Sequence, residues 1–153
     1  MRLECQTVAK CRPEHVWKAF ADIDRWATWN PVIGQSRWLS GEPWKLGGRF
    51  FMELLQPSKM SFKPVIVESN APNRVAWTGT GPGFKGTHGH EFTLQPDGTT
   101  MVKTWEEFSG FVTWFFSTSF KGRLLKMYEA WLKSLASEAE KLAEARGAAG
   151  GER

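Results

Sequence analysis

The chain has 153 residues, which suits one domain and is short for two. Hydrophobic residues make up 41% and charged residues 24% of it, as in ordinary soluble globular proteins. No apolar run approaches the roughly 20 residues of a membrane span, and the first residues do not resemble a signal sequence. The net charge is +4, but the basic residues are dispersed, so nucleic-acid binding is not indicated. We therefore expect a soluble, cytoplasmic protein.

Aromatic residues are the unusual part of the composition. The chain contains 9 Trp, 11 Phe and one Tyr, together 14% of its residues. Large rings contribute most to protein cores and to apolar pockets. Composition alone does not decide whether these rings fill the interior or line a cavity.

The N-terminal part predicts one strand and two short helices. Residues 3–8 suit a short strand. A helix begins at Pro13, where a missing N–H costs nothing in the first turn, and its apolar stripe has helical spacing. A second short helix spans 25–29 and ends before Pro31, because the residue before a proline is disfavoured in helices.

The rest of the chain predicts six further strands and a long helix. Runs of strand-like composition alternate with turn signals and indicate an antiparallel meander over 32–39, 49–55, 64–69, 74–78, 88–95 and 101–109. From 117 to 144 apolar residues recur at steps of three or four, which is typical of an amphipathic helix. Residues 1–145 then form a single domain, and the Gly- and Ala-rich residues 146–153 form a disordered tail.

These elements favour an α+β fold. The apolar face of an antiparallel sheet and the apolar stripe of a long helix must each be buried. The economical arrangement is a curved seven-stranded antiparallel sheet wrapped around the C-terminal helix, with the two short helices between strands 1 and 2.

Six segments, in this order, resemble the START-like (SRPBCC) superfamily with its helix-grip fold. They resemble most its polyketide cyclase/dehydrase and lipid-transport branch. The segments are PEHVWKAFAD (13–22), WATWNP (26–31), GGRF (47–50), VIVESNAPNRVAW (65–77), GHEFTL (89–94) and EEFSG (106–110). The resemblance implies a cavity between sheet and helix that takes lipids, hormones, polyketides or other apolar molecules. Some members perform chemistry there, but catalytic residues are not shared, so the resemblance implies none here.

Two adjacent strands carry the candidate polar residues, since alternate side chains of a strand share a face. The inward face of the first strand carries His88, His90, Phe92 and Leu94. The preferred inward face of the next carries Val102, Thr104, Glu106 and Phe108, because this choice keeps Lys103 and Glu107 outside.

The loop around Pro96-Asp97-Gly98 sets the register of these strands. A loop of three or five residues gives the preferred faces, whereas a two-residue Asp97-Gly98 turn gives the opposite ones. In the five-residue register, His90 faces Glu106 directly. Three interpretations of this pair stay open: a satisfied polar pair inside a cavity, an anchor for a polar group of the ligand, or an acid/base pair.

Metal and cofactor sites are not expected. His88 and His90 share a strand face and Glu106 is a possible third ligand, but no clear fourth ligand is present for zinc. The sequence contains no nucleotide-binding motif, nucleophile–base signature or Gly-rich phosphate loop.

Other residues are candidates for the cavity wall. Apolar walls are expected from Trp77, Phe92, Phe120 and Leu124, and polar contacts from His88, Thr104 and Tyr128. Tyr128, the only tyrosine, either caps a polar ligand group or bonds to the backbone. Trp29 lies at a helix–strand corner, either at one end of the cavity or packed in the core.

The segment 110–116 carries four aromatic residues in a connection, where chains usually run over the surface. It packs on the core at the start of the helix, closes the cavity as a lid, or contacts a membrane or a second copy. A homodimer would use Phe111, Trp114, Phe115 and Phe116.

The leading functional hypothesis is binding, and possible transport or sequestration, of a small hydrophobic or amphipathic molecule in the cavity. The first alternative is an enzyme of cyclase or dehydratase type that uses His90 and Glu106 as its acid/base pair. The second is a protein-interaction module with a filled core.

Overall fold

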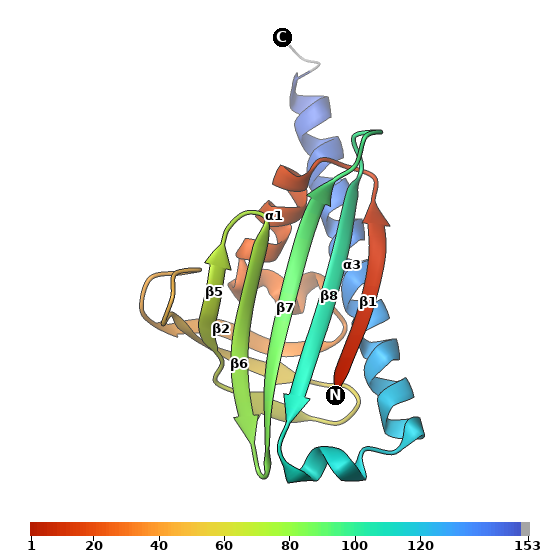
Figure 1. Cartoon of the computed structure of the whole chain (residues 1–153). Coiled ribbons are helices and arrows are strands. Elements are labelled where there is room, and N and C mark those ends of the chain that lie inside the picture. Colours follow the sequence, from red (N-terminus) through yellow and green to blue (C-terminus); the bar gives the residue numbers. More distant parts are fainter. Residues whose placement is uncertain (151–153) are drawn as a thin grey trace.

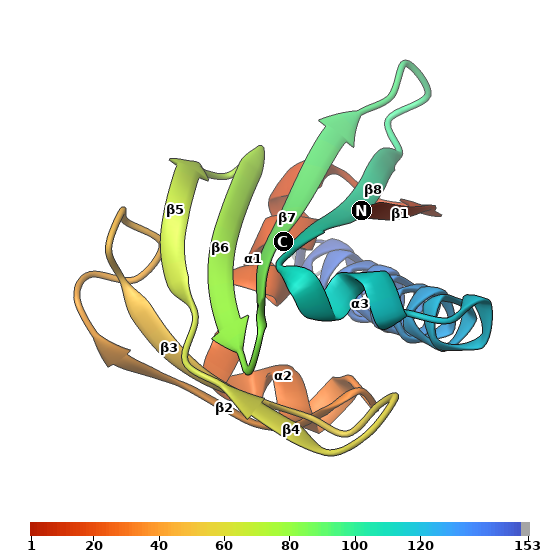
Figure 2. The same cartoon turned by 60° about the horizontal axis from the view of Figure 1, so that its bottom comes forward.

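A computed structural model describes residues 1–150 as a curved antiparallel sheet around a long helix (Figures 1 and 2). The sheet follows the strand order β1-β8-β7-β6-β5-β3-β2. Its strands are β1 (Arg2–Ala9), β2 (Ile33–Ser40), β3 (Arg49–Leu54), β5 (Val65–Asn70), β6 (Arg74–Gly81), β7 (Phe84–Leu94) and β8 (Thr100–Ser109). The seven predicted strands are confirmed. A three-residue strand, β4 (Met60–Phe62), also pairs with β3 and was too short to predict.

The helices confirm the helix-grip fold. Helix α1 (Pro13–Ala21), the 3₁₀ turn η1 (Ile23–Arg25) and α2 (Trp26–Trp29) lie between β1 and β2. After β8 come the 3₁₀ segment η2 (Phe111–Phe115) and the long helix α3 (Thr118–Gly150). Helix α3 packs against α1, β1 and β8, while the sheet curves around it (Figure 2).

The C-terminal boundary differs from the prediction. Helix α3 continues through residues 146–150, which were expected to be disordered. Alanine and arginine are strong helix formers, so Gly147 weakens this last part of the helix without ending it. Residues 151–153 of the expected tail lie outside the described residues.

The β7–β8 hairpin has the predicted inward faces but the shorter loop. The Gln95 amide donates to the Thr99 carbonyl at 2.8 Å, which leaves three residues in the loop. Asp97 accepts a hydrogen bond from the Thr99 amide at 3.0 Å, and Gly98 has a φ of +84°, a conformation that favours glycine. This local chemistry fixes the tight loop.

The shorter loop corrects the predicted pairing. His88, not His90, lies opposite Glu106, and His90 lies opposite Thr104. The register that places His90 against Glu106 needs a loop longer by two residues, so that prediction was wrong.

An aromatic core fills the interior beside α1 and α2. Its buried or nearly buried rings lie 4.9–6.4 Å from their neighbours and come from Phe20, Trp26, Trp44, Phe50, Trp77, Phe92 and Trp131. Two indoles also donate hydrogen bonds to the backbone: Trp26 to the Phe20 carbonyl at 2.8 Å and Trp44 to the Ala21 carbonyl at 2.9 Å. These bonds join the end of α1 to α2 and to the segment between β2 and β3.

Candidate functional site

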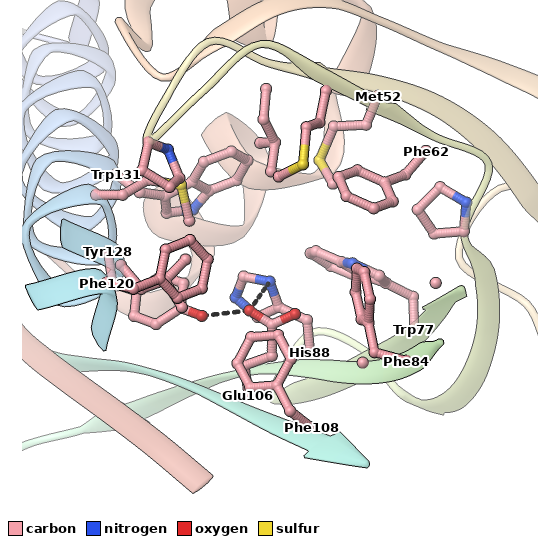
Figure 3. Close-up of a pocket in the computed structure, with 18 of the residues that line it drawn as sticks. Met52, Phe62, Trp77, Phe84, His88, Glu106, Phe108, Phe120, Tyr128 and Trp131 are labelled. Atoms are coloured by element: carbon pink, nitrogen blue, oxygen red, sulfur yellow. Dashed lines mark hydrogen bonds and ion pairs between the residues drawn. The ribbon is translucent and has the colours of Figure 1, made fainter. Parts of the chain in front are cut away.

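A cavity of about 140 Å³ lies between the concave face of the sheet and the first half of α3 (Figure 3). This is several times the space that one water molecule needs. The lining is apolar apart from His88, Glu106 and Tyr128. Its other residues are Met52, Leu54, Pro57, Met60, Phe62, Pro64, Trp77, Gly79, Phe84, Gly86, Phe108, Phe116, Phe120, Leu124, Met127 and Trp131. The interior is thus neither fully packed nor wholly open: Trp77 and Trp131 belong to both the aromatic core and the cavity wall.

Six of the ten candidate site residues line this cavity. They are Trp77, His88, Glu106, Phe120, Leu124 and Tyr128. Thr104 is buried directly behind His88 and contacts it through a hydrogen bond. Trp29, His90 and Phe92 are not part of the lining.

His90 is enclosed by aromatic rings. The rings of Phe20, Trp77 and Trp131 lie 4.8, 5.2 and 5.9 Å from its own, and the residue has no exposed surface. Among the described residues, neither ring nitrogen has a hydrogen-bond partner. Burial, and to a lesser extent His88, lowers the pKa of His90 well below its usual value, so the ring is neutral. His90 is therefore a core residue.

Phe92 and Trp29 also lie elsewhere. Phe92 packs in the aromatic core, 5.1 Å from Phe20. Trp29 is half-buried and faces a surface groove between α2 and α3, together with Lys133 and Glu138. The end of the cavity thus does not reach the helix–strand corner.

Tyr128 and Glu106 join α3 to β8 across the cavity wall. The Tyr128 hydroxyl donates a hydrogen bond to Oε2 of Glu106. Burial raises the pKa of Glu106 to about 7, although the bond from Tyr128 opposes this rise. Burial and the neighbouring Glu106 raise the pKa of Tyr128, so its proton stays in place. Glu106 is thus a carboxyl group that changes charge near neutral pH.

His88 is held as one neutral tautomer. The Thr104 hydroxyl donates to the Gly89 carbonyl at 3.1 Å, so it accepts from Nε2–H of His88, 2.6 Å away. The other ring nitrogen, Nδ1, then carries a lone pair and lies 3.9 Å from Oε2 of Glu106. Burial lowers the pKa of His88 to about 3, so the ring is uncharged at neutral pH.

The polar corner of the cavity therefore offers mainly acceptors. Nδ1 of His88 has an unused lone pair, and the second carboxyl oxygen of Glu106 lies over Gly86. A side chain at Gly86 would crowd this oxygen, since even a Cβ there would lie 2.8 Å from Oε1. A ligand group that donates a hydrogen bond is the complement of this corner.

Some lining residues escaped the sequence analysis for identifiable reasons. Phe84 and Gly86 lie before the expected start of their strand, and Met60 and Phe62 lie in the unpredicted β4. Trp131 belonged to the predicted helix stripe, so a closer reading of that stripe would have found it. Met127 gave no comparable signal.

The two histidines do not form a metal site with Glu106. Among residues 1–150, no group of three or more His, Cys, Asp and Glu side chains has the arrangement to hold a metal ion. His90 is separated from Glu106 because the register places Thr104 opposite it.

The sequence matches a known protein family over nearly its whole length. The model of the family described as polyketide cyclase / dehydrase and lipid transport matches residues 2–140. The chain belongs to this family. The comparison with curated proteins found no match.

Several solved structures share the fold. The ZhuI aromatase/cyclase from a Streptomyces species superposes with a TM-score of 0.81 at 13% identity, over 96% of this chain and 98% of that one. A START superfamily protein from Mycobacterium smegmatis gives 0.74 at 15% identity, over 92% and 98% of the two chains. A hypothetical protein from Helicobacter pylori gives 0.78 at 17% identity, over 91% and 88%. Such low identities establish the fold and leave the activity to be argued from the site.

Across residues 1–150, no helix combines the length and the apolar character needed to cross a membrane. The longest helix, α3, has charged residues along most of its length.

Proposed function

We propose that this protein binds a small, largely apolar molecule in the cavity and holds one polar group of it at Glu106 and His88. The observation that carries the proposal is that the polar side chains of the cavity lie together, apart from its apolar wall. Its wall is apolar, and its three polar side chains gather where β7, β8 and α3 meet. Ligand pockets typically combine apolar walls with a few placed polar groups.

The polar corner favours a ligand with a hydroxyl or N–H group. His88 presents a lone pair on Nδ1, and its Nε2–H is already used by Thr104. A ligand donor placed between Nδ1 and the Glu106 carboxyl group satisfies acceptors that the protein alone leaves open. Charged ligands gain less, because both side chains are uncharged over much of the acid-to-neutral range.

A cavity-blocking variant tests this proposal. Indole is a small apolar probe with a single N–H donor, and isothermal titration calorimetry measures its binding. A Cβ at Gly79 meets only a Phe62 ring carbon, at 3.7 Å, so this position has room for a side chain. Gly79→Leu fills the cavity, whereas Gly79→Ala is the matched control.

We expect the wild-type chain and Gly79→Ala to bind the probe with similar affinity. Gly79→Leu is expected to weaken binding by about tenfold or more. Circular dichroism of each variant checks that it folds. Equal binding by wild type and a folded Gly79→Leu chain would show that the probe does not occupy the cavity and would refute the proposal.

Acid–base catalysis is the second candidate function, and the pKa values favour it. Glu106 has a pKa of about 7 and His88 of about 3, and opposed shifts of neighbouring groups are typical of acid/base pairs. The pair predicted from the sequence was His90 with Glu106; in the structure His88 takes that place. The solved aromatase/cyclase has the same fold, which is consistent with this candidate.

Proton exchange separates the two functions. Acetophenone is a small apolar ketone, and its methyl protons exchange in heavy water when a base removes them. If Glu106 acts as a base, the protein accelerates this exchange, the rate rises with pH through about 7, and Glu106→Gln abolishes the acceleration. Probe binding without accelerated exchange would leave binding as the function.

A further inference from the structure

Segment η2 exposes three large aromatic side chains. Phe111, Trp114 and Phe115 are 69%, 89% and 80% exposed. In Figure 1, this short teal helix lies at the bottom of the molecule, beside the β6–β7 turn. Large apolar rings exposed together mark contact sites for partners, ligands or lipids. We call these three residues the η2 patch.

Segment η2, which carries the patch, contacts the β6–β7 turn. Gly110 precedes it with a φ of +111°, and a Cβ at this glycine would collide with the Gly83 carbonyl. The Val112 amide donates to that carbonyl at 3.4 Å. In this structure the three rings point outward and are not part of the cavity lining.

The η2 patch also borders the cavity. The next aromatic residue, Phe116, lines the cavity and packs against Phe120, with ring centroids 4.8 Å apart. Phe84, from the strand that follows the β6–β7 turn, lines it from the other side. Segment η2 thus lies at the end of the molecule where Phe84 and Phe116 line the cavity.

The segments that flank the η2 patch carry positive charge. From residue 109 to residue 128 the sequence contains no Asp or Glu, but it contains Lys121, Arg123 and Lys126. Lys85, at the start of β7, is also exposed. The acidic side chain at this end of β8, Glu107, is paired with Arg2 at 2.6 Å. This combination of aromatic rings with flanking Lys and Arg suits the interface of an anionic bilayer.

We propose that the η2 patch docks the protein on a membrane surface that contains anionic lipids, so that the rim of the cavity faces the bilayer. Tryptophan and phenylalanine side chains insert at the level of the lipid headgroups. We expect Lys121 and Arg123, near the start of α3, to contact lipid phosphates in this orientation. The proposal does not depend on the nature of the cavity ligand.

A second copy of the chain fits this surface less well. Two copies that met through the η2 patch would each bring positively charged flanking segments, with Lys85 and Arg123, to the contact, and like charges disfavour association. A stable dimer also needs about 1,200 Å² or more of buried surface, which a five-residue segment does not supply alone.

Sedimentation with vesicles tests the proposal. The probes are vesicles of phosphatidylcholine alone and of phosphatidylcholine with phosphatidylglycerol. We expect the wild-type chain to sediment with the anionic vesicles and to be released by salt, which screens charge. The double variant Trp114→Ser/Phe115→Ser is expected to lose at least about tenfold in vesicle affinity. The double variant Lys121→Gln/Arg123→Gln is expected to lose a similar amount. Leu46→Ser, at a residue 70% exposed away from η2, is the control and should bind as wild type does.

Two results would overturn the proposal. One is the absence of vesicle binding by the wild-type chain, or equal binding by wild type and the Trp114→Ser/Phe115→Ser variant. The other is a dimer, seen by native mass spectrometry without lipid and lost in that same variant, which would assign the η2 patch to a second copy. Probe binding in the cavity is expected to persist in both double variants, so failure of docking is distinguishable from failure of the proposed binding function.

Discussion

The hydroxyl of Tyr128 on α3 donates its proton to the carboxyl group of Glu106 on β8. The bond fixes the position of Glu106 at the cavity wall, because the helix and the last strand of the sheet each hold one partner. The pKa of Glu106 therefore depends on burial, which raises it, and on the hydrogen bond from Tyr128, which lowers it (Figure 3). Four of the predictions below follow from this polar corner.

Replacing Glu106 by Gln should stabilise the fold at neutral and alkaline pH. The native pKa of Glu106 is raised from 4.5 to about 7, so the native state holds its proton while the unfolded chain releases it. The wild type therefore loses stability as pH rises from about 4.5 to 7, by about 3 kcal/mol in total. Glutamine is neutral and still accepts the bond from Tyr128, so it avoids this loss.

Urea unfolding of both proteins across this pH range measures the difference. The two free energies of unfolding should agree below pH 4.5 and diverge up to about pH 7. Other titrating groups cancel in the difference because both proteins contain them. A constant difference at all pH values would show that Glu106 titrates normally.

Tyr128→Phe should raise the pKa of Glu106 further. The hydrogen bond from Tyr128 stabilises the carboxylate, and burial opposes ionisation. With the hydroxyl removed, only the effect of burial remains, so the midpoint moves above about 7. The carboxyl ¹³C chemical shift of labelled Glu106 measures this midpoint directly. An unchanged or lower midpoint would mean that the bond does not act on the carboxyl group.

His88 should be a neutral ring with its proton on Nε2. Long-range ¹H–¹⁵N NMR distinguishes this tautomer from the Nδ1–H form. Because its native pKa lies near 3 and its ordinary value is 6.5, the ring binds a proton more readily when the chain unfolds. His88 therefore lowers stability progressively as pH falls below about 6.5.

Thr104→Val tests the origin of this tautomer. The substitution removes the acceptor for His88 and the donor to the Gly89 carbonyl. Leaving these buried groups unpaired should cost about 1–3 kcal/mol in unfolding free energy and release the tautomer preference. Thr104→Ser keeps the hydroxyl and should keep the Nε2–H form of His88. If Thr104→Val and Thr104→Ser both lost this tautomer preference, the hydroxyl of residue 104 would not be its cause.

Gly89→Ala should destabilise the protein by about 1–3 kcal/mol. The Trp105 indole lies flat over Gly89 on the outer face of the sheet, where a Cβ would collide with the ring. Arg2 and Arg74 stack on this indole, 4.7 and 5.1 Å from its centroid, which limits its movement. Thermal unfolding measures the loss; Gly79→Ala on β6 is the control and should lose little, since its Cβ has room.

Much of the fold could be predicted because its elements are long or clearly bounded. Helix α1 begins at Pro13 as expected, and the inward faces of β7 and β8 follow from simple alternation. The short strand β4 contains too few residues to show a pattern. The end of α3 was misjudged because glycine was weighted above the alanines around it.

The candidate site was harder to predict because it depends on register and on long-range packing. A shift of two residues leaves both faces unchanged, so alternation could not distinguish His88 from His90 as the partner of Glu106. That His90 would be enclosed by Phe20 and Trp131 depends on where α1 and α3 pack, which no local pattern reveals.

The three-residue β7–β8 loop lies at the end of the sheet opposite η2, yet it determines the chemistry of the cavity (Figure 1). If the hairpin closed two residues further along, His90 would stand opposite Glu106 and His88 would move toward the rim. A relative of this chain could therefore acquire a different polar corner through a change in loop length alone, with every cavity residue retained. Comparing related chains at this site thus requires aligning their hairpins by strand pairing before matching residues by type.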